Sequence, residues 1–201
     1  MTAVKALVFA LLCAPALAAA LRLPSAVDPA AALTHTTGEW ALRILLITLA
    51  ITPLRHLTGI NKLARLRRMC GLFVFAYAAG HFSVYLLLDL QLDFSLLAED
   101  IIERKYITVG FAAFVLLVPL AATSADWCAR KLGGKKWQTL HRLVYVIGIL
   151  AILHYLWLKK GDDWGGAAAH GAILAFLLFC RLPVMRGRLA KIAGKLNKAR
   201  R

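Results

Sequence analysis

The stretch MCGLFVFAYAAGHFSVYLLL, residues 69–88, contains twenty residues and no Asp, Glu, Lys or Arg. A helix needs about 20 predominantly apolar residues to cross the hydrocarbon core of a bilayer. Two arginines, Arg67 and Arg68, precede the stretch, and Asp89 follows it. We therefore predict a transmembrane helix over residues 69–88, in which His81 is the only ionisable side chain apart from tyrosine and cysteine.

Five further apolar runs accompany this segment and account for most of the chain. The 201 residues are 61% hydrophobic and 17% charged, with a mean hydropathy of +0.70, whereas a soluble domain is about 45–50% apolar. This composition excludes a disordered chain and favours a membrane protein. We predict an all-α integral membrane protein, a six-helix transmembrane bundle that forms a single domain over residues 1–201. The predicted spans are residues 4–21, 39–54, 69–88, 106–123, 140–158 and 164–182.

Basic residues predict how this bundle lies in the membrane. Twenty-five Lys and Arg against ten Asp and Glu give a net charge of +15, which in a soluble protein would suggest nucleic acid as a partner. Here the basic residues flank apolar runs, so we expect membrane lipids and no nucleic acid. Short cytoplasmic loops are rich in Lys and Arg. The loops after the second and fourth spans and the basic tail 183–201 are therefore predicted to be cytoplasmic, with both termini, and the acidic loop 89–105 to be external.

Two details of the first half of the chain have specific interpretations. Residues 4–21 end in Ala16-Leu17-Ala18-Ala19-Ala20, and a positive residue, an apolar stretch and small residues also describe a cleaved signal peptide. Both interpretations place the following loop outside. Thr36 or Thr37 is the expected cap of the second helix, because threonine is a favoured N-cap residue.

Four histidines fall inside predicted spans, where an ionisable side chain is costly and usually has a function: His81, His141, His154 and, in the last span, His170. His81 lies 13 residues past Arg68, hence about 20 Å from the cytoplasmic edge, and His154 lies 18 residues past Lys136, hence about 27 Å. Both belong to the outer half of the bundle and can face each other from different helices. Opposed neutral imidazoles are the usual axial ligands of a b-type haem in a bundle core. His141 lies near the cytoplasmic face.

His141 and His154 are 13 residues apart in one predicted span. A rise of about 20 Å suits two stacked redox centres, but the two rings point about 140° apart on a straight helix. Either a kink near Gly148 aligns them, or they serve different partners. Each of the four histidines has a plainer alternative, a hydrogen bond to a neighbouring helix.

Arg68 and Arg142 are predicted cofactor contacts near the cytoplasmic end, because haem propionates or a flavin phosphate would bind cations there. Plain positive-inside anchoring is the alternative. The chain contains no GxGxxG, P-loop or HExxH motif. It therefore has no Rossmann-type nicotinamide site, and its electrons must come from another protein or from a lipid-soluble donor.

An ordered series of segments resembles the MsrQ (YedZ) family, the haem-binding membrane subunits of periplasmic methionine sulfoxide reductase systems, within the ferric-reductase-like transmembrane superfamily. The resemblance covers roughly residues 37–185. It rests on Thr37-Gly38, Thr52-Pro53-Leu54-Arg55, Arg67-Arg68-Met69-Cys70-Gly71-Leu72, Tyr106-Ile107-Thr108-Val109-Gly110, Thr123-Ser124, Trp137-Gln138-Thr139-Leu140-His141-Arg142-Leu143-Val144-Tyr145 and His154-Tyr155-Leu156-Trp157.

The resemblance implies a multi-pass haem b protein of the bacterial inner membrane. Such proteins take electrons from the quinone pool or a cytosolic flavin reductase and pass them to a periplasmic molybdopterin enzyme, MsrP, which reduces methionine sulfoxide in oxidised proteins. The chain would be the electron-transfer subunit rather than the catalytic one. The family is also described as using FMN. Its histidines map onto His81, His141 and His154.

The chain departs from the wider superfamily at one position. There each haem-bearing helix usually carries two histidines, whereas here Arg67 or Arg68 stands where the first histidine of the third span would fall. Two alternatives to the electron-transfer function stay open at this point. One is a ferric or other metal reductase of the same superfamily, and the other is a cofactor-free transporter or membrane scaffold.

Overall fold

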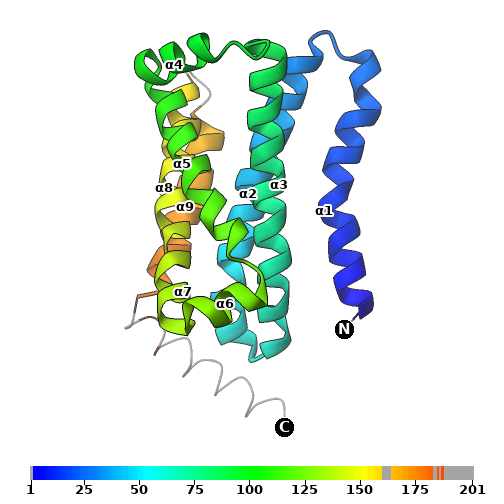
Figure 1. Ribbon diagram of the computed structural model, residues 1–201. Coiled ribbons are helices and arrows are strands. Elements are labelled where there is room, and N and C mark those ends of the chain that lie inside the picture. Colours follow the sequence, from blue (N-terminus) through cyan, green and yellow to red (C-terminus); the bar gives the residue numbers. More distant parts are fainter. Residues whose placement is uncertain (1, 160–163, 183–184, 186, 188–201) are drawn as a thin grey trace.

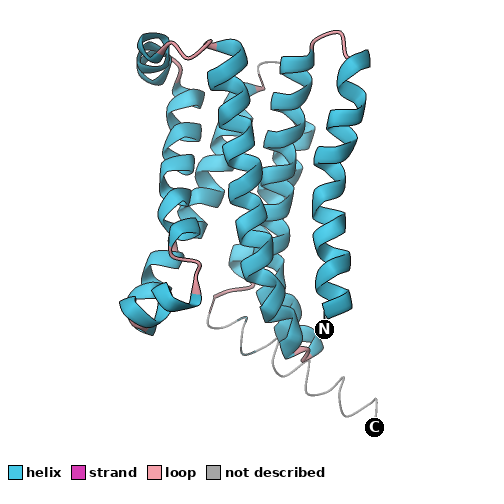
Figure 2. Ribbon diagram, turned by 45° about the vertical axis from the view of Figure 1, so that its right-hand side comes forward, coloured by secondary structure: helices cyan, strands magenta, loops and turns pink. Residues whose placement is uncertain are grey.

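A computed structural model of the chain describes residues 2–159, 164–182, 185 and 187, and within these ranges the chain forms helices and no strand (Figures 1 and 2). Two 3₁₀ turns, Leu23–Ser25 and Asn61–Arg65, and a π turn, Tyr85–Asp89, join or extend the α-helices. The α-helices are α1 (Thr2–Arg22), α2 (Pro29–Thr58), α3 (Leu66–Val84), α4 (Phe94–Glu103), α5 (Lys105–Ala122), α6 (Asp126–Leu132), α7 (Gly134–His141), α8 (Leu143–Leu158) and α9 (Gly165–Phe179).

Five helical segments of the described chain are long and apolar enough to cross a bilayer. They are Ala3–Ser25, Pro29–Thr58, Asn61–Asp89, Lys105–Ala122 and Gly134–Leu158. The sixth predicted span corresponds to α9, which is apolar but has only 15 residues. An all-helical, multi-pass membrane protein is therefore confirmed, while the sixth crossing and the cytoplasmic termini stay predictions. Most of the predicted tail 183–201 lies outside the described residues.

The long helices run side by side, and two pairs pack most extensively, α2 with α3 and α5 with α8. Figure 1 shows α4 across one end of the bundle, with α6 and α7 at the opposite end, where α1 begins. Helix α9 packs against α2 and α8, and α1 packs against α2 and α3. The bundle is thus built from two helical hairpins that face each other, with α1 and α9 added outside them.

The main core fills the space between the two hairpins. Ile44, Val74, Leu117 and Ile147, one from each of α2, α3, α5 and α8, are buried there. Helix α1 is attached by Tyr77, whose hydroxyl donates to the Leu12 carbonyl at 2.7 Å and accepts from the Ala16 N–H at 3.1 Å. In a regular helix these two backbone groups bond each other, so the phenol is inserted into the backbone ladder of α1.

The second helix begins about ten residues earlier than predicted. Asp28 caps it, accepting the Ala31 N–H at 2.9 Å, and Pro29 occupies the first helical position, where a missing N–H costs nothing. Thr37 is not the cap: its hydroxyl donates to the Leu33 carbonyl within the helix. The hydropathy pattern placed the start at the end of the polar stretch 34–39, but the helix begins before that stretch and continues through it.

The acidic segment predicted as an external loop contains α4. Asp93 caps this helix, accepting the backbone N–H groups of Ser95 at 2.8 Å and Leu96 at 3.2 Å as well as the Ser95 hydroxyl. The hydrogen bond from the Ser95 hydroxyl, followed by those from the two backbone groups, lowers the pKa of Asp93 below its ordinary value of 3.8. Folding of α4 therefore favours the ionised cap.

We expect α4 to loosen in acid because of this cap. A carboxylate whose pKa is lower in the folded state stabilises the fold above its ordinary pKa of 3.8, and the stabilisation is lost as the pH falls through the lowered value. Hydrogen exchange of residues 94–103, corrected for intrinsic rates, should therefore speed up below about pH 4. Asp93→Asn keeps a capping oxygen without titrating, so its exchange should not show this step. An equal acid step in the variant would contradict the assignment.

Candidate functional site

His81 and His154 come together between the two hairpins, near the end of the bundle where α4 lies. His81 belongs to α3 and His154 to α8, and their ring centroids lie 6.1 Å apart with the rings nearly perpendicular, at 84°. The approach expected from their depths in the sequence is therefore present. His141 is not part of this pair.

Backbone carbonyls of the neighbouring helices determine the tautomer of both imidazoles. Nδ1 of His81 donates to the Thr34 carbonyl at 2.8 Å, and Nδ1 of His154 donates to the Tyr106 carbonyl at 2.7 Å. Because a carbonyl can only accept, Nδ1 carries the proton in each ring and Nε2 keeps its lone pair. This arrangement, a hydrogen bond on one ring nitrogen and a free lone pair on the other, is the one that orients histidine as a metal ligand.

A glycine beside each ring allows the imidazole to reach its carbonyl partner. A Cβ at Gly38 would lie 2.9 Å from both Cε1 and Nδ1 of His81, and a Cβ at Gly110 would lie 2.6 Å from Nδ1 of His154. Any other residue would push the ring away from its carbonyl. Each glycine follows its carbonyl residue by four positions, Thr34 before Gly38 and Tyr106 before Gly110, so both hairpins use the same local arrangement.

No pattern in the sequence predicted Thr34, Gly38, Tyr106 or Gly110 as parts of the site, although the last three lie in segments that carry the family resemblance. The glycines could have been found because glycine destabilises a helix interior and therefore needs a reason to be there. Here the reason is the imidazole that packs against each one. The two carbonyl acceptors carry no residue-specific signal, because every residue type supplies a backbone carbonyl.

The separation of the two rings matches a single metal atom between them. An imidazole nitrogen bonds a transition metal at about 2 Å and the ring centre lies about 1 Å beyond it, so two rings on one metal have centroids about 6 Å apart. Among the described residues no group of three or more His, Cys, Asp or Glu could hold a metal ion. Two protein ligands alone suit a metal whose other positions a macrocycle fills.

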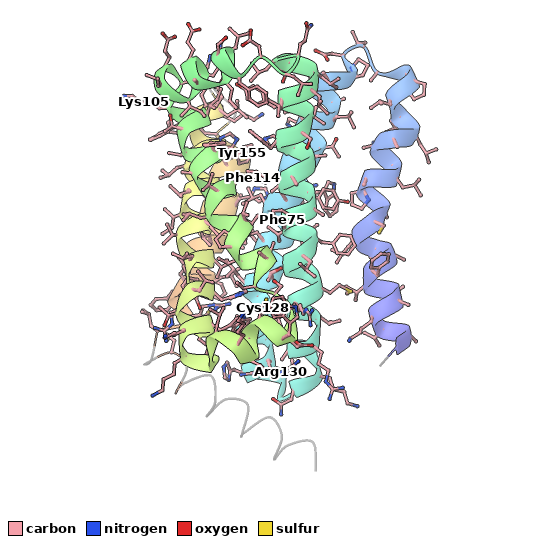
Figure 3. All side chains as sticks on the ribbon, in the orientation of Figure 1. Phe75, Lys105, Phe114, Cys128, Arg130 and Tyr155 are labelled. Carbon is pink, nitrogen blue, oxygen red and sulfur yellow. The ribbon has the colours of Figure 1, made fainter. Side chains whose placement is uncertain are left out.

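Phenylalanines occupy the space between the hairpins on the inner side of this pair. Phe82 of α3 lies 5.0 Å from Phe114 and 5.8 Å from Phe111, both on α5, measured between ring centroids. Phe75 stacks with Phe114 at 6.1 Å, and Figure 3 shows these two side chains between α3 and α5. The surroundings of the imidazoles on this side are apolar and aromatic, as expected for a flat hydrophobic cofactor.

A polar network closes the site at its α4 end. The Tyr85 hydroxyl donates to Asp100, which also bonds Arg104 at 3.0 Å. A hydrogen bond with Tyr106, the residue whose carbonyl holds His154, and the nearby Asp100 carboxylate raise the pKa of Arg104. The acidic segment is therefore attached to both hairpins directly outside the histidine pair.

His141 occupies a separate site at the other end of the bundle. It is the last residue of α7, and the helix breaks at Arg142 rather than kinking near Gly148. Trp137 stacks on its ring, with 4.0 Å between centroids, and Nε2 lies 3.1 Å from the Thr123 hydroxyl. His141 and His154 thus face different partners, the second of the two arrangements that the sequence left open.

The predicted arginine contacts also lie at this end. Arg68 pairs with Asp126 at 2.9 Å across a largely exposed surface, and Arg142 is exposed next to His141. Neither side chain is near the pair formed by His81 and His154. Arg67 donates to the Thr52 hydroxyl at 3.1 Å.

Comparison with known proteins gives a consistent result. Residues 37–152 match the family described as ferric reductase like transmembrane component. The protein-methionine-sulfoxide reductase heme-binding subunit MsrQ of Ralstonia nicotianae is 52% identical over 170 residues, 83% of this chain and 78% of that protein. The MsrQ subunit of Bordetella pertussis is 54% identical over 156 residues, 77% of this chain and 75% of that protein. No solved structure matches the chain.

Proposed function

The chain belongs to the family of MsrQ heme-binding subunits of protein-methionine-sulfoxide reductases, within the ferric reductase like transmembrane family, and from this premise we propose that it carries electrons across a membrane through a haem b held by His81 and His154. The observation that supports this most is the pair of imidazoles 6.1 Å apart, each with Nδ1 on a carbonyl. The glycine beside each ring is the second.

A bound haem supplies one-electron redox chemistry. The chain's residues hold and isolate it. His81 and His154 would hold the haem iron through Nε2, and a haem held by two histidines would supply electron transfer rather than oxygen chemistry. The carbonyls of Thr34 and Tyr106 keep both rings in orientation, and the phenylalanines exclude water on the inner side.

The charges of the bundle support a proposed orientation in the bacterial inner membrane, with six crossings. The end that carries α6 and α7 is rich in Lys and Arg, which favours the cytoplasmic side. The other end carries Asp93, Glu99, Asp100 and Glu103 on or beside α4. We propose that this acidic end docks the periplasmic molybdopterin reductase MsrP, because complementary charge steers such encounters.

Electrons are proposed to arrive at the basic end, from the quinone pool or from a cytosolic flavin reductase. His141 lies there with Trp137 stacked on it, and it is the proposed cofactor contact on this side. Arg68 and Arg142 would face anionic groups there, such as the propionates of a second haem or the phosphate of FMN. Arg68 would have to exchange its exposed partner Asp126 for that group, which costs little for a surface pair.

Electron transfer across a sealed membrane tests the function. We expect proteoliposomes containing the full chain and a quinol to reduce external MsrP, measured as turnover of a methionine sulfoxide peptide. With His154→Ala, the rate should fall by at least about tenfold. His170→Ala is the matched control, because His170 is half-buried on α9, outside the proposed site, and bonds the Gly166 carbonyl of its own helix. Equal rates in all three proteins would contradict the proposal. Reduction of ferric citrate without reduction of MsrP would favour the metal-reductase alternative.

A further inference from the structure

An apolar groove runs between α8 and α9 on the outside of the bundle. Its volume is about 180 Å³, and it is open along one side. Gly171 and Ala175 stand one helical turn apart on α9, so their small side chains leave space there. The other side chains that line it include Ile149 and Leu153 of α8 and Leu174 and Leu178 of α9.

A fixed cation lies where both sides of this groove end. Arg181 lies in the turn that follows α9, and its backbone N–H donates to the carbonyl of Leu178, a groove residue, at 3.0 Å. Tyr145 precedes Ile149 by about one turn of α8. These two side chains are in contact: the Arg181 guanidinium donates to the Tyr145 hydroxyl and lies 5.0 Å from the centre of its ring. A second hydrogen bond, to the Leu49 carbonyl at 2.7 Å, attaches the guanidinium to α2.

Among the residues that the structure describes, no carboxylate pairs with that cation. Arg67 lies close enough to Arg181 to repel it, and Arg55 adds to the repulsion on Arg67. Asp126, a carboxylate that the structure describes at this end, pairs with Arg68. Residues 164–201 contain no Asp or Glu at all. Nε of Arg181 is buried and has no hydrogen-bond partner among the described residues.

We propose that the groove and Arg181 together bind an anionic phospholipid of the leaflet next to α6 and α7. An acyl chain would lie against the apolar groove, and the headgroup phosphate would accept hydrogen bonds at Arg181, with Arg67 providing further positive charge. The apolar groove and the unbalanced guanidinium are independent observations, and one molecule with a long apolar chain and a phosphate satisfies both. Neither depends on haem.

Native mass spectrometry of the full chain, titrated with dioleoyl phosphatidylglycerol or with dioleoyl phosphatidylcholine, tests this site. We expect one phosphatidylglycerol to bind more tightly than the zwitterionic lipid by about fivefold or more, and Arg181→Gln and Arg67→Gln each to reduce the preference. Arg65→Gln is the matched control. Arg65 is an exposed arginine of the same end, and it is not one of the two arginines proposed to bind the headgroup. Its preference should equal that of the wild type.

A second variant tests the groove without touching the arginines. Ala175 is exposed on α9, so Ala175→Phe should fill the groove from outside, leave the core intact and weaken both lipids together. Equal binding of the two lipids by the wild type, or an unchanged preference in Arg181→Gln, would overturn the proposal. So would glycerol phosphate displacing the lipid at equal concentration, since that result would show a soluble phosphate site. Because the readout is lipid stoichiometry, it does not depend on the redox function.

Discussion

Replacing either His81 or His154 with alanine is expected to remove the haem from the purified protein. The two rings lie 6.1 Å apart and each presents Nε2 from a different hairpin, so loss of one leaves the proposed site with a single protein ligand. We expect the haem-to-protein ratio to fall by at least about tenfold. The pyridine haemochrome assay against protein mass measures this directly.

The same experiment includes its own controls. His170→Ala should keep the wild-type haem content, because this ring bonds the Gly166 carbonyl one turn earlier and contacts the Tyr155 ring, outside the histidine pair. His141→Ala should keep the spectrum of the outer pair, because His141 lies with Trp137 and Thr123 at the other end of the bundle. Helical content by circular dichroism separates haem loss from unfolding. Full haem content in folded His81→Ala and His154→Ala would refute the ligand assignment.

Adding a single methyl group at Gly110 is expected to damage the site without removing any ligand. A Cβ there would lie 2.6 Å from Nδ1 and 2.9 Å from Cε1 of His154, so the ring must move away from the Tyr106 carbonyl. Loss of such an orienting hydrogen bond typically costs about 10- to 100-fold in metal affinity. Gly110→Ala should therefore release haem that much more readily to a competing haem-binding protein such as apomyoglobin.

Gly38 and Gly71 provide a second test variant and a control for Gly110→Ala. Gly38→Ala should behave like Gly110→Ala, because its Cβ would lie 2.9 Å from the His81 ring, in the same local arrangement. Gly71 also lies inside a helix, but a Cβ there would meet nothing within 4 Å. Gly71→Ala should keep its haem and stabilise α3 by about 0.5–1 kcal/mol. Equal haem release from all three variants would show that the glycines beside the histidines have no special role.

The spans were predictable from the sequence because the bilayer imposes one length on every crossing helix. The segment 69–88 lies inside the observed Asn61–Asp89, and 106–123 is displaced by one residue from α5. What hydropathy could not locate were helical residues outside the apolar runs. The first turns of α2 precede a polar stretch, α4 mixes acidic with apolar residues, and α6 and α7 are short and basic. Local caps such as Asp28 and Asp93 mark where the first two of these begin.

The candidate site was predictable in part for the same reason. The positions of His81 and His154 along their spans predicted that both lie in the outer half of the bundle. Because their helices belong to hairpins that face each other, the two rings meet there. The partner of His141 could not be found this way, because the break at Arg142 turns α7 away from the axis of α8. Backbone carbonyls, which hold both imidazoles, have no signature in the sequence.

The most direct test of the central claim is the reduced-minus-oxidised absorption spectrum of the purified wild-type chain. A haem held by His81 and His154 predicts a low-spin spectrum with a Soret band and separate α and β bands, both lost together in His154→Ala. A colourless wild-type protein, or a spectrum that is identical in His154→Ala, would contradict it.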